Sequence, residues 1–574
     1  MLKRIMSLLV CPIVAAPLLA GTAFAEESKT EATSGIVGEW MWSSTVADMG
    51  ENGAEIMMTR CAETGITDVY LLVKGTGGTL SYLKTKYTDN LARKNRDVLQ
   101  EVIDAAHKRG IRVHAWICNM EDTAYKAANP DAGMWHYVRA RDNNKINLYD
   151  PSYREYMTTV AAELAAYDID GLHLDYIRYN HLANGWGEND IEALKAMGAD
   201  IDRVRELIET TFGYNGKTAD SNYVFNAYNN GDKEARLIAQ YRRNNVKEYA
   251  RAVIDAAKKV NPSLIISAAT MPEGAYNEGY ATLHYGQSYD DAAELYDYIC
   301  PMAYSTNYGQ SDSWILTIAK NSIKKGNKVV MGLQVYDKAT TSRLMTEIAN
   351  MRTLMNDATY GEGTLGFVFF RAGTLDYAKV TYDVENKTIA VKVFSEASST
   401  AVSFVQVSLQ SGLKVVGTSV GEGFSNSASL TVPSNRGSIK LSGSDIMDSR
   451  GYLYIKYDGE LDPSKTVATV TFNRSSAAIV YTSCYAKGDS NADMGNPGDF
   501  NEVVETTKPK ETTKSPETTD TPEETTEPVS TEAQATAPTA KKEDGCGSVV
   551  GFGTLIATLA GAALAFVKKR RFGV

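Results

Sequence analysis

Residues 170–179 read DGLHLDYIRY, and apolar and polar side chains alternate along this stretch as they do along a β-strand. Successive side chains of a strand point to opposite faces of the sheet, which separates Leu172 and Leu174 from His173 and Asp175. In a closed barrel of parallel strands, the two leucines would face the surrounding helices, and His173 and Asp175 would point inward. The stretch therefore predicts a barrel strand with a carboxylate at its carboxyl end.

Seven further apolar stretches alternate with amphipathic helical patterns, which is typical of a parallel α/β fold. We expect strands at residues 38–42, 68–74, 112–118, 171–176, 264–270, 298–304, 328–335 and 365–370. We expect helices at residues 51–64, 97–109, 153–167, 236–260, 291–295, 313–325 and 341–355. No G-x-G-x-x-G follows the first strand, so the pattern favours a (β/α)₈ TIM barrel over residues 36–377 rather than an open doubly wound sheet.

Barrel enzymes present their catalytic groups at the carboxyl ends of strands and in the loops that follow them. Asp175 falls at this position of the fourth predicted strand, and the long insertion at residues 180–233 is expected to wall a substrate cleft. In the alternative interpretation, Asp175 only accepts hydrogen bonds from Arg178 or from loop amides. For His173, contact with a substrate and a role as a core histidine are equally open.

The stretch at residues 170–179 resembles the D-G-[IL]-H-[FL]-D-[DY]-x-x-[YF]-P motif of the glycosyl-hydrolase-like family 10 proteins, which are bacterial (β/α)₈ enzymes. Three later segments resemble this family in the same order along the chain: QYRRNNV at 240–246, DYICPMAY at 297–304 and GFVFF at 366–370. The sequence departs from the family at Asn180, where proline is usual, and at AATMPE, residues 268–273, which ends the fifth strand. The resemblance covers about residues 36–377 and implies a glycoside hydrolase.

Glycoside hydrolysis ordinarily requires two carboxyl groups that flank the scissile bond. The resemblance implies that Asp175 corresponds to the fourth-strand nucleophile of α-amylase-like barrels. It also implies that Glu273, just past the fifth strand, is the general acid, although an exposed loop glutamate is an equally open interpretation. The other candidates for the second carboxylate are Glu39, Asp297 and Asp337.

Polar and aromatic side chains near strand ends or in the long insertion are the candidates for binding sugar, because aromatic rings can stack on sugar faces. The substrate-binding candidates are His173, Arg178, Tyr176, Trp42, His114, Trp116, Trp186 and Tyr304. The sequence contains no H-E-x-x-H motif, no zinc-spaced Cys/His cluster, no G-x-S-x-G elbow and no phosphate loop. We therefore expect neither a metal nor a cofactor.

After residue 377 the apolar period changes to two, which predicts a second unit of short strands over residues 378–487. This unit loosely resembles the cohesin or carbohydrate-binding β-sandwiches of secreted glycosidases, and a ligand-binding role and a spacer role are both open. Residues 488–493 begin like a calcium loop, but Met494 and Phe500 stand at the positions that require Gly and Glu, which favours a plain turn.

The two ends of the chain predict a protein on the outer surface of a cell. Residues 1–25 have the charged start, apolar run and A-F-A site of a secretory signal peptide. Residues 501–545 form a Thr/Pro/Glu-rich linker that we expect to be an extended stalk. Residues 549–567 are uncharged and predict a transmembrane helix, and the basic residues 568–571 predict a cytoplasmic end. This tail resembles the anchors of Gram-positive surface proteins, without an LPxTG motif.

The net charge of −11 and the lack of a basic stretch in the folded part argue against a nucleic-acid partner. The linker at 501–545 alone has eleven acidic and five basic residues, so more than half of the net charge belongs to it. Once the ends are set aside, four cysteines remain, for which buried thiols are favoured over disulfides: Cys61, Cys118, Cys300 and Cys484.

Together, these patterns predict a surface-anchored glycoside hydrolase that acts on an extracellular poly- or oligosaccharide, with the cell's own wall glycan as one possible substrate. The alternative hypothesis is a carbohydrate-binding surface protein or adhesin whose barrel has no catalytic activity.

Overall fold

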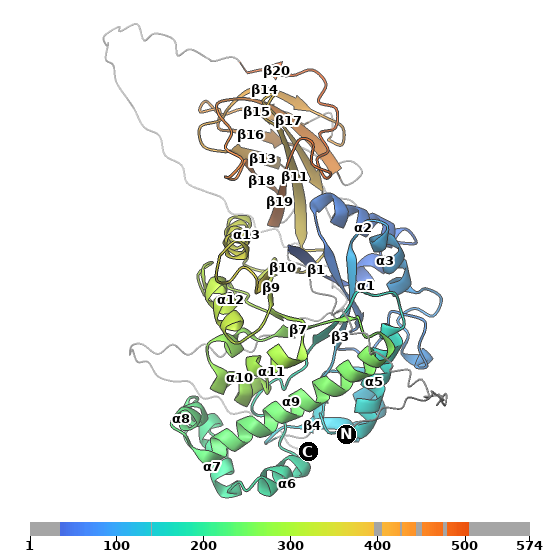
Figure 1. The fold of residues 1–574 in the computed structure, drawn as a ribbon, viewed down its shortest axis with the longest axis vertical. Helices are drawn as coiled ribbons and strands as arrows, with labels where there is room; N and C mark the ends of the chain where they lie inside the picture. The colour runs from blue at the N-terminus through green and yellow to red at the C-terminus, as the bar shows by residue number, and fades with distance from the viewer. Residues whose placement is uncertain are drawn as a thin grey trace, which may run out of the picture. The chain divides into compact units, whose positions relative to one another are not determined.

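The computed structural model describes residues 35–138, 141–394, 404–424, 428–443, 450–473 and 479–503. Its central feature is a closed barrel of eight parallel strands in the order β1-β10-β9-β8-β7-β6-β3-β2 (Figure 1). The barrel strands are β1 Ile36–Trp42, β2 Asp68–Lys74, β3 Arg112–Cys118, β6 Gly171–Asp175, β7 Ile265–Thr270, β8 Tyr298–Pro301, β9 Val329–Gln334 and β10 Thr364–Phe370. The predicted TIM barrel is confirmed.

The end of a strand is set by local backbone hydrogen bonds and does not always coincide with the end of the apolar stretch. β8 ends at Pro301, three residues before the predicted end, because the N–H of Ala303 turns back to the carbonyl of Pro301 at 2.8 Å. Met302 and Tyr304 therefore belong to the loop that leaves the carboxyl end of the barrel.

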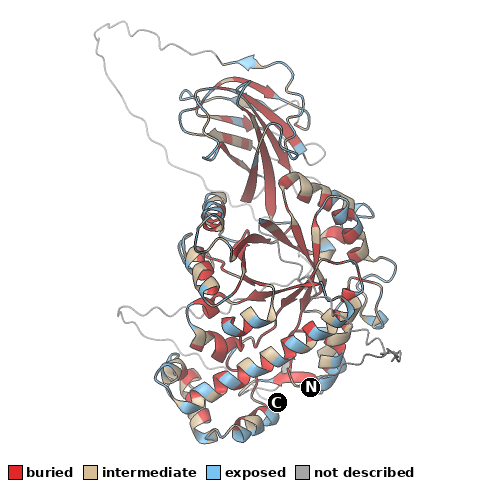
Figure 2. Cartoon of the chain, in the orientation of Figure 1, coloured by how far each residue is buried: buried red, intermediate tan, exposed pale blue. Residues whose placement is uncertain are grey.

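Helices follow most of the strands and pack their apolar faces against the barrel. They are α1 Ser43–Ala47, α2 Gly53–Thr64, α3 Val98–His107, α5 Pro151–Ala165, α9 Lys233–Val260, α11 Tyr289–Leu295, α12 Trp314–Lys324 and α13 Thr341–Met355. Sequence signals set their starts: the Asp150 carboxylate caps α5 by accepting the N–H of Tyr153, and Asp232 caps α9 by accepting the N–H of Ala235. Figure 2 shows buried strands and alternating buried and exposed residues along α9.

The alternation predicted for residues 170–179 is present in β6. Leu172 and Leu174 are fully buried in the core cluster that also contains Val160 of α5 and Val253 of α9. His173 points the other way, and its ring lies 5.7 Å from the ring of Trp40 in β1. The register of β6 is therefore fixed by packing on both faces.

The loops after β3 and β6 contain additional elements. After β3 come α4 Thr123–Ala128, η2 Pro130–Ala132, β4 Gly133–Trp135 and β5 Arg141–Ile146; after β6 come α6 Glu188–Ala196, α7 Ile201–Phe212 and α8 Tyr223–Asn229. Shorter elements are η1 Thr88–Asn90, η3 Pro272–Ala275 and α10 Glu278–Tyr285. The insertion after β6 has its own apolar cluster, which includes Leu194 and Leu207.

A second set of strands follows the barrel and forms two sheets that share one apolar core. One sheet has the order β19-β11-β12-β17-β14-β20, and the other has the order β15-β16-β13-β18. The strands are β11 Leu375–Asp383, β12 Thr388–Phe394, β13 Phe404–Leu409, β14 Lys414–Val420, β15 Ser429–Thr431, β16 Ser438–Ser442, β17 Arg450–Asp458, β18 Ala468–Asn473, β19 Ile479–Ala486 and β20 Asn501–Glu502. Most neighbours are antiparallel, while β11 and β19 pair in parallel.

Cys61, Cys118 and Cys300 are buried thiols, as the sequence predicts, whereas Cys484 is exposed. In β19, residues 479–483 are buried, and Cys484 is the first exposed residue.

The predicted signal peptide at 1–25, the linker beyond residue 503, the transmembrane segment at 549–567 and the basic residues 568–571 lie outside the described residues. Within the described ranges, no helix combines the length and the apolar composition that a membrane span requires.

Candidate active site

Asp175 ends β6 and lies at the carboxyl end of the barrel, where it pairs in register with Cys118 of β3. Its side chain is nearly buried, with 5% exposure. One carboxylate oxygen accepts the N–H of Tyr176 at 2.6 Å, and the other accepts the indole N–H of Trp116 at 3.2 Å. Trp116 of β3 therefore contacts the carboxylate that the sequence singles out.

Arg178 provides the positive charge beside this carboxylate. Its Nη1 lies 3.7 Å from Asp175 Oδ1, and its guanidinium lies 4.5 Å from the ring centroid of Tyr176. Burial raises the pKa of Asp175, while the charge of Arg178 and the two N–H donors oppose this effect. The structure brings together Asp175, Tyr176, Arg178 and Trp116.

Glu273 lies on the short η3 helix that directly follows β7, the neighbour of β6 in the barrel. It is 8% exposed, so it is not the exposed loop glutamate of the alternative interpretation. The hydroxyl of Tyr308 donates to its carboxylate at 3.2 Å. Burial raises the pKa of Glu273, while the Tyr308 hydroxyl and the charge of Arg178 oppose this effect. Arg178 therefore acts electrostatically on both predicted carboxyl groups.

Glu121 is a third buried carboxylate in this region, and sequence reasoning missed it. It follows the end of β3, is 8% exposed, and its charge raises the pKa of both Asp175 and Arg178. The side-chain amides of Asn180 and Asn144 donate to its two oxygens. Asn180, which departs from the family pattern, thus holds a carboxylate near Asp175. The sequence signal that could have identified Glu121 as a site residue was its position just past the end of a predicted strand.

A buried ion pair fixes the loop that carries Glu121. Lys74, at the end of β2, is fully buried, and its Nζ lies 2.9 Å from Asp122 Oδ2. The same ammonium donates to the carbonyl of Cys118 at 2.8 Å and to the hydroxyl of Tyr153 at 3.1 Å. This network ties the ends of β2 and β3 to α5.

Two more predicted residues lie at the carboxyl ends of strands. Trp42 ends β1, and the guanidinium of Arg371 lies 3.1 Å from its ring centroid. The ring of Tyr304, after β8, lies 5.8 Å from Phe370 at the end of β10. Both residues therefore lie at the same end of the barrel as Asp175.

His173 lies inside the barrel and does not contact Asp175 in any described interaction. Its Nε2 accepts the indole N–H of Trp40 at 3.1 Å, and its Nδ1 lies 2.9 Å from the hydroxyl of Ser267. Burial and then the nearby His114 hold its pKa well below the usual range, so the ring is neutral. With Nε2 accepting, Nδ1 must carry the proton. His173 is a packed core histidine.

His114 is not at the carboxyl end, which corrects its assignment as a sugar donor. Its Nε2 lies 2.8 Å from Asp68, the first residue of β2, and its ring stacks on Tyr70 at 4.6 Å. The side chain is fully buried. The alternation along β3 places both His114 and Trp116 inside the barrel, but His114 lies one layer closer to the amino ends of the strands.

Trp186 lies in the insertion after β6. Its indole N–H donates to the carbonyl of Leu182 at 2.6 Å, and its ring contacts Tyr137 at 5.7 Å. It therefore packs within the helical insertion, whose apolar cluster the strand pattern did not reveal.

The other candidates for the second carboxylate are in different places. Glu39 faces outward from β1, where Tyr377 donates to it and the thiol of Cys61 in α2 lies 3.7 Å away. Asp297 precedes β8 and accepts the N–H of Ile266 near the amino ends of the strands. Asp337 follows β9 and is exposed.

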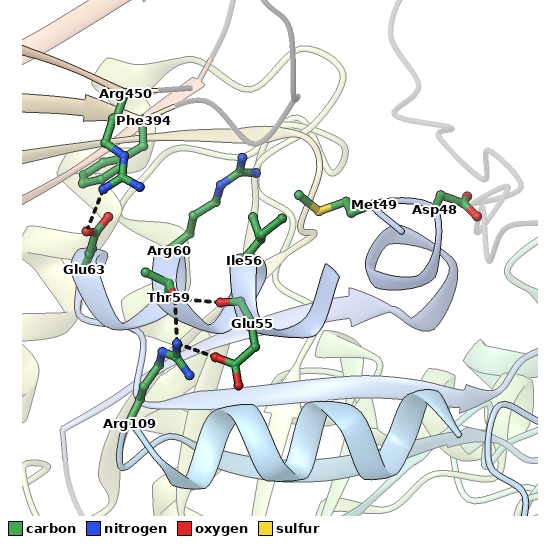
Figure 3. A pocket seen from close by; sticks show the side chains of 10 residues that line it. All are labelled: Asp48, Met49, Glu55, Ile56, Thr59, Arg60, Glu63, Arg109, Phe394 and Arg450. Carbon is green, nitrogen blue, oxygen red and sulfur yellow. Dashed lines mark hydrogen bonds and ion pairs between the residues drawn. The ribbon is translucent and has the colours of Figure 1, made fainter. Parts of the chain in front are cut away.

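A separate cavity of about 580 Å³ lies beside α2 and does not include Asp175 or Glu273 (Figure 3). Arg109 pairs with Glu55 at 2.7 Å, and Arg450 pairs with Glu63 at 3.7 Å across this space. These charges neutralise one another. Among the described residues, no group of His, Cys, Asp and Glu side chains is arranged to hold a metal ion.

Comparison with known families finds a match to the Glycosyl hydrolase-like 10 model over residues 38–343. The matched region contains β6, η3 and the loops that carry Arg178 and Glu121. No curated protein sequence matches the chain.

Several solved structures match the chain at low sequence identity. The PgaB (BpsB) glycoside hydrolase domain from Bordetella bronchiseptica has 13% identity and a TM-score of 0.47, covering 59% of this chain and 94% of that chain. The β-galactosidase from the psychrophilic Marinomonas ef1 has 10% identity and a TM-score of 0.43, with coverages of 59% and 54%. The α-L-fucosidase isoenzyme 2 from Paenibacillus thiaminolyticus has 14% identity and a TM-score of 0.40, with coverages of 59% and 46%. This chain thus spans about half the length of the last two proteins.

The Lys74 network generates a stability prediction. Lys74→Met leaves the carboxylate of Asp122 buried without its counter-charge, so we expect the free energy of unfolding to fall by about 3–5 kcal/mol. Equilibrium urea unfolding of the full chain measures this change. The matched control is Lys94→Met on an exposed lysine, for which we expect a change within about 0.5 kcal/mol. Equal effects of the two substitutions would show that the buried pair does not stabilise the fold.

Proposed function

The chain belongs to the Glycosyl hydrolase-like 10 family, and from this premise we propose that it hydrolyses glycosidic bonds in a poly- or oligosaccharide with Asp175 and Glu273 as the two carboxyl groups. One observation carries the proposal. The two side chains follow neighbouring strands of the barrel, both are nearly buried, and the charge of Arg178 acts on both.

The surroundings of the two groups support different roles. Asp175 accepts two N–H donors and lies beside the Arg178 guanidinium, and all three contacts favour its ionised form. For Glu273, a backbone hydrogen bond, the Tyr308 hydroxyl and the charge of Arg178 favour the ionised form, but burial outweighs them, raises the pKa and favours the protonated form. A pair with different proton affinities is the requirement for acid and base roles at one pH. Asp175 is then the nucleophile or base, and Glu273 is the acid.

In this reaction, Glu273 donates its proton to the leaving glycosidic oxygen as the bond to the anomeric carbon breaks. Asp175 either attacks that carbon and forms a glycosyl-enzyme ester, which water then hydrolyses with Glu273 as base, or it removes a proton from a water that attacks the carbon. Tyr308 positions the Glu273 carboxyl, and Trp116 positions the Asp175 carboxylate through its indole N–H. Each of the two carboxyl groups therefore has a hydrogen-bond partner that restricts its orientation, and a fixed orientation of the catalytic groups lowers the activation barrier.

Isosteric amides remove the proposed chemistry with little change in shape. We expect Asp175→Asn and Glu273→Gln each to lower kcat by about 10²–10⁴-fold on a hydrolysed polysaccharide, measured as reducing ends released. The matched control is Asp337→Asn, which changes an exposed carboxylate after β9 and should leave kcat as in the wild type. Wild-type rates in the Asp175→Asn variant, with unchanged circular dichroism, would remove Asp175 from the mechanism. Glycan binding without hydrolysis by the wild type would instead support the carbohydrate-binding alternative.

The Tyr308 contact predicts a shift in the pH profile. Because the Tyr308 hydroxyl lowers the pKa of Glu273, Tyr308→Phe should raise that pKa further. A general acid is active while protonated, so the activity lost at alkaline pH should persist to higher pH in the variant. The measurement is kcat/KM against pH for the wild type and Tyr308→Phe. A shift of the alkaline limb toward lower pH would contradict the role of Glu273.

We also propose that the enzyme acts outside the cell and is held there by residues 549–567. The support is the signal-peptide pattern at 1–25, the uncharged stretch at 549–567 and the basic residues 568–571. In intact Gram-positive host cells, externally added protease should remove the barrel, and deletion of residues 549–574 should release it into the medium. Retention of the truncated chain in the membrane fraction would contradict the anchor.

A further inference from the structure

Exposed aromatic side chains are concentrated on one face of the barrel. In the ranges that the structure describes, the exposed aromatic residues are Trp135, which follows β3, and Tyr276, which follows β7. They retain 37% and 49% exposure, respectively. Loops after barrel strands form the face that carries substrate. The exposed rings therefore lie in loops on the same face as Asp175 and Glu273.

Tyr276 belongs to a row of three rings that ends at Glu273. Its ring contacts Trp314 at 6.3 Å with an interplanar angle of 65°. Trp314 in turn lies 5.1 Å from the ring of Tyr308, whose hydroxyl donates to Glu273. Trp314 and Tyr308 are half-buried, whereas Tyr276 is exposed.

Tyrosines also surround the Glu273 carboxyl on the side of α10. Burial and then the Glu273 carboxylate raise the pKa of both Tyr280 and Tyr285, as they do for Tyr276 and Tyr308. Such rings offer an apolar face for the C–H groups of a sugar and a polar edge for its hydroxyls. This composition fits carbohydrate better than it fits a purely apolar ligand.

We propose that Tyr276 and Trp314 form a sugar-stacking subsite beside Glu273, and that the substrate is an extended oligo- or polysaccharide rather than a single sugar on a small leaving group. The reaction rests on the proposed function, whereas sugar binding at these rings does not. A sugar placed at Asp175 and Glu273 leaves the outer rings of the row available for the next part of the chain. If Glu273 is the acid, this subsite holds the leaving group.

The experiment compares chain lengths. The full chain and its variants are assayed with cello-, xylo-, manno-, malto- and chito-oligosaccharides of two and six sugars, by kcat/KM and by quenching of tryptophan fluorescence. In the wild type we expect kcat/KM to be higher for six sugars than for two. In Tyr276→Ala and Trp314→Ala this advantage should fall by about 10-fold, as expected for the loss of one stacking contact.

The matched control is Tyr360→Ala, which removes a half-buried ring from the loop before β10, at the opposite end of the barrel. This variant should keep the wild-type dependence on chain length. An unchanged six-to-two ratio in both Tyr276→Ala and Trp314→Ala would overturn the subsite while leaving the proposed hydrolysis intact.

A binding measurement distinguishes failure of the sugar-stacking subsite from failure of the proposed hydrolysis. If the wild type hydrolyses no member of the panel, but six-sugar chains quench its fluorescence and Tyr276→Ala weakens that binding about 10-fold, the subsite stands and the hydrolase proposal fails. If the wild type neither hydrolyses nor binds any six-sugar chain in the panel, the subsite is overturned as well.

Discussion

The alternation of side chains along β6 is the constraint on which the site depends. Leu172 and Leu174 are fully buried on the helix side of the strand, and each contributes about 1.5–3 kcal/mol of transfer free energy. A slip of one residue would turn both leucines into the barrel interior and turn Asp175 outward. The packing of two leucines against α5 and α9 thus fixes a carboxylate at the mouth of the barrel.

The charges placed there are stabilised locally. Asp175 has Arg178, Lys74 has Asp122, and Glu121 has the amides of Asn180 and Asn144. Burial of a charge without such partners costs several kcal/mol, so each partner is a condition of the fold as well as of the chemistry. Glu273 accepts a hydrogen bond from the Tyr308 hydroxyl, and burial raises its pKa. The proposed acid and base roles rest on the different partners of these two carboxyl groups.

Periodicity predicted the barrel because each strand has to bury alternate side chains against helices. It did not distinguish layers within the barrel: His114 and Trp116 both point inward, yet only Trp116 contacts Asp175. Site residues in loops were harder to predict from the sequence. The fold, and not the local sequence pattern, brings Glu121 near Arg178 and Tyr308 near Glu273. Trp186 lies in the insertion, as expected, but the insertion has its own apolar cluster, and this ring packs against it.

If Asp175 and Glu273 act as proposed, one glycosidic bond of the substrate lies between them. The most direct measurement is a crystal structure of the Glu273→Gln variant with a six-sugar chain bound. The account predicts a glycosidic oxygen within hydrogen-bond distance of the Gln side chain and an anomeric carbon facing Asp175. A chain bound elsewhere, such as in the cavity beside α2, with no sugar at Asp175, would contradict it.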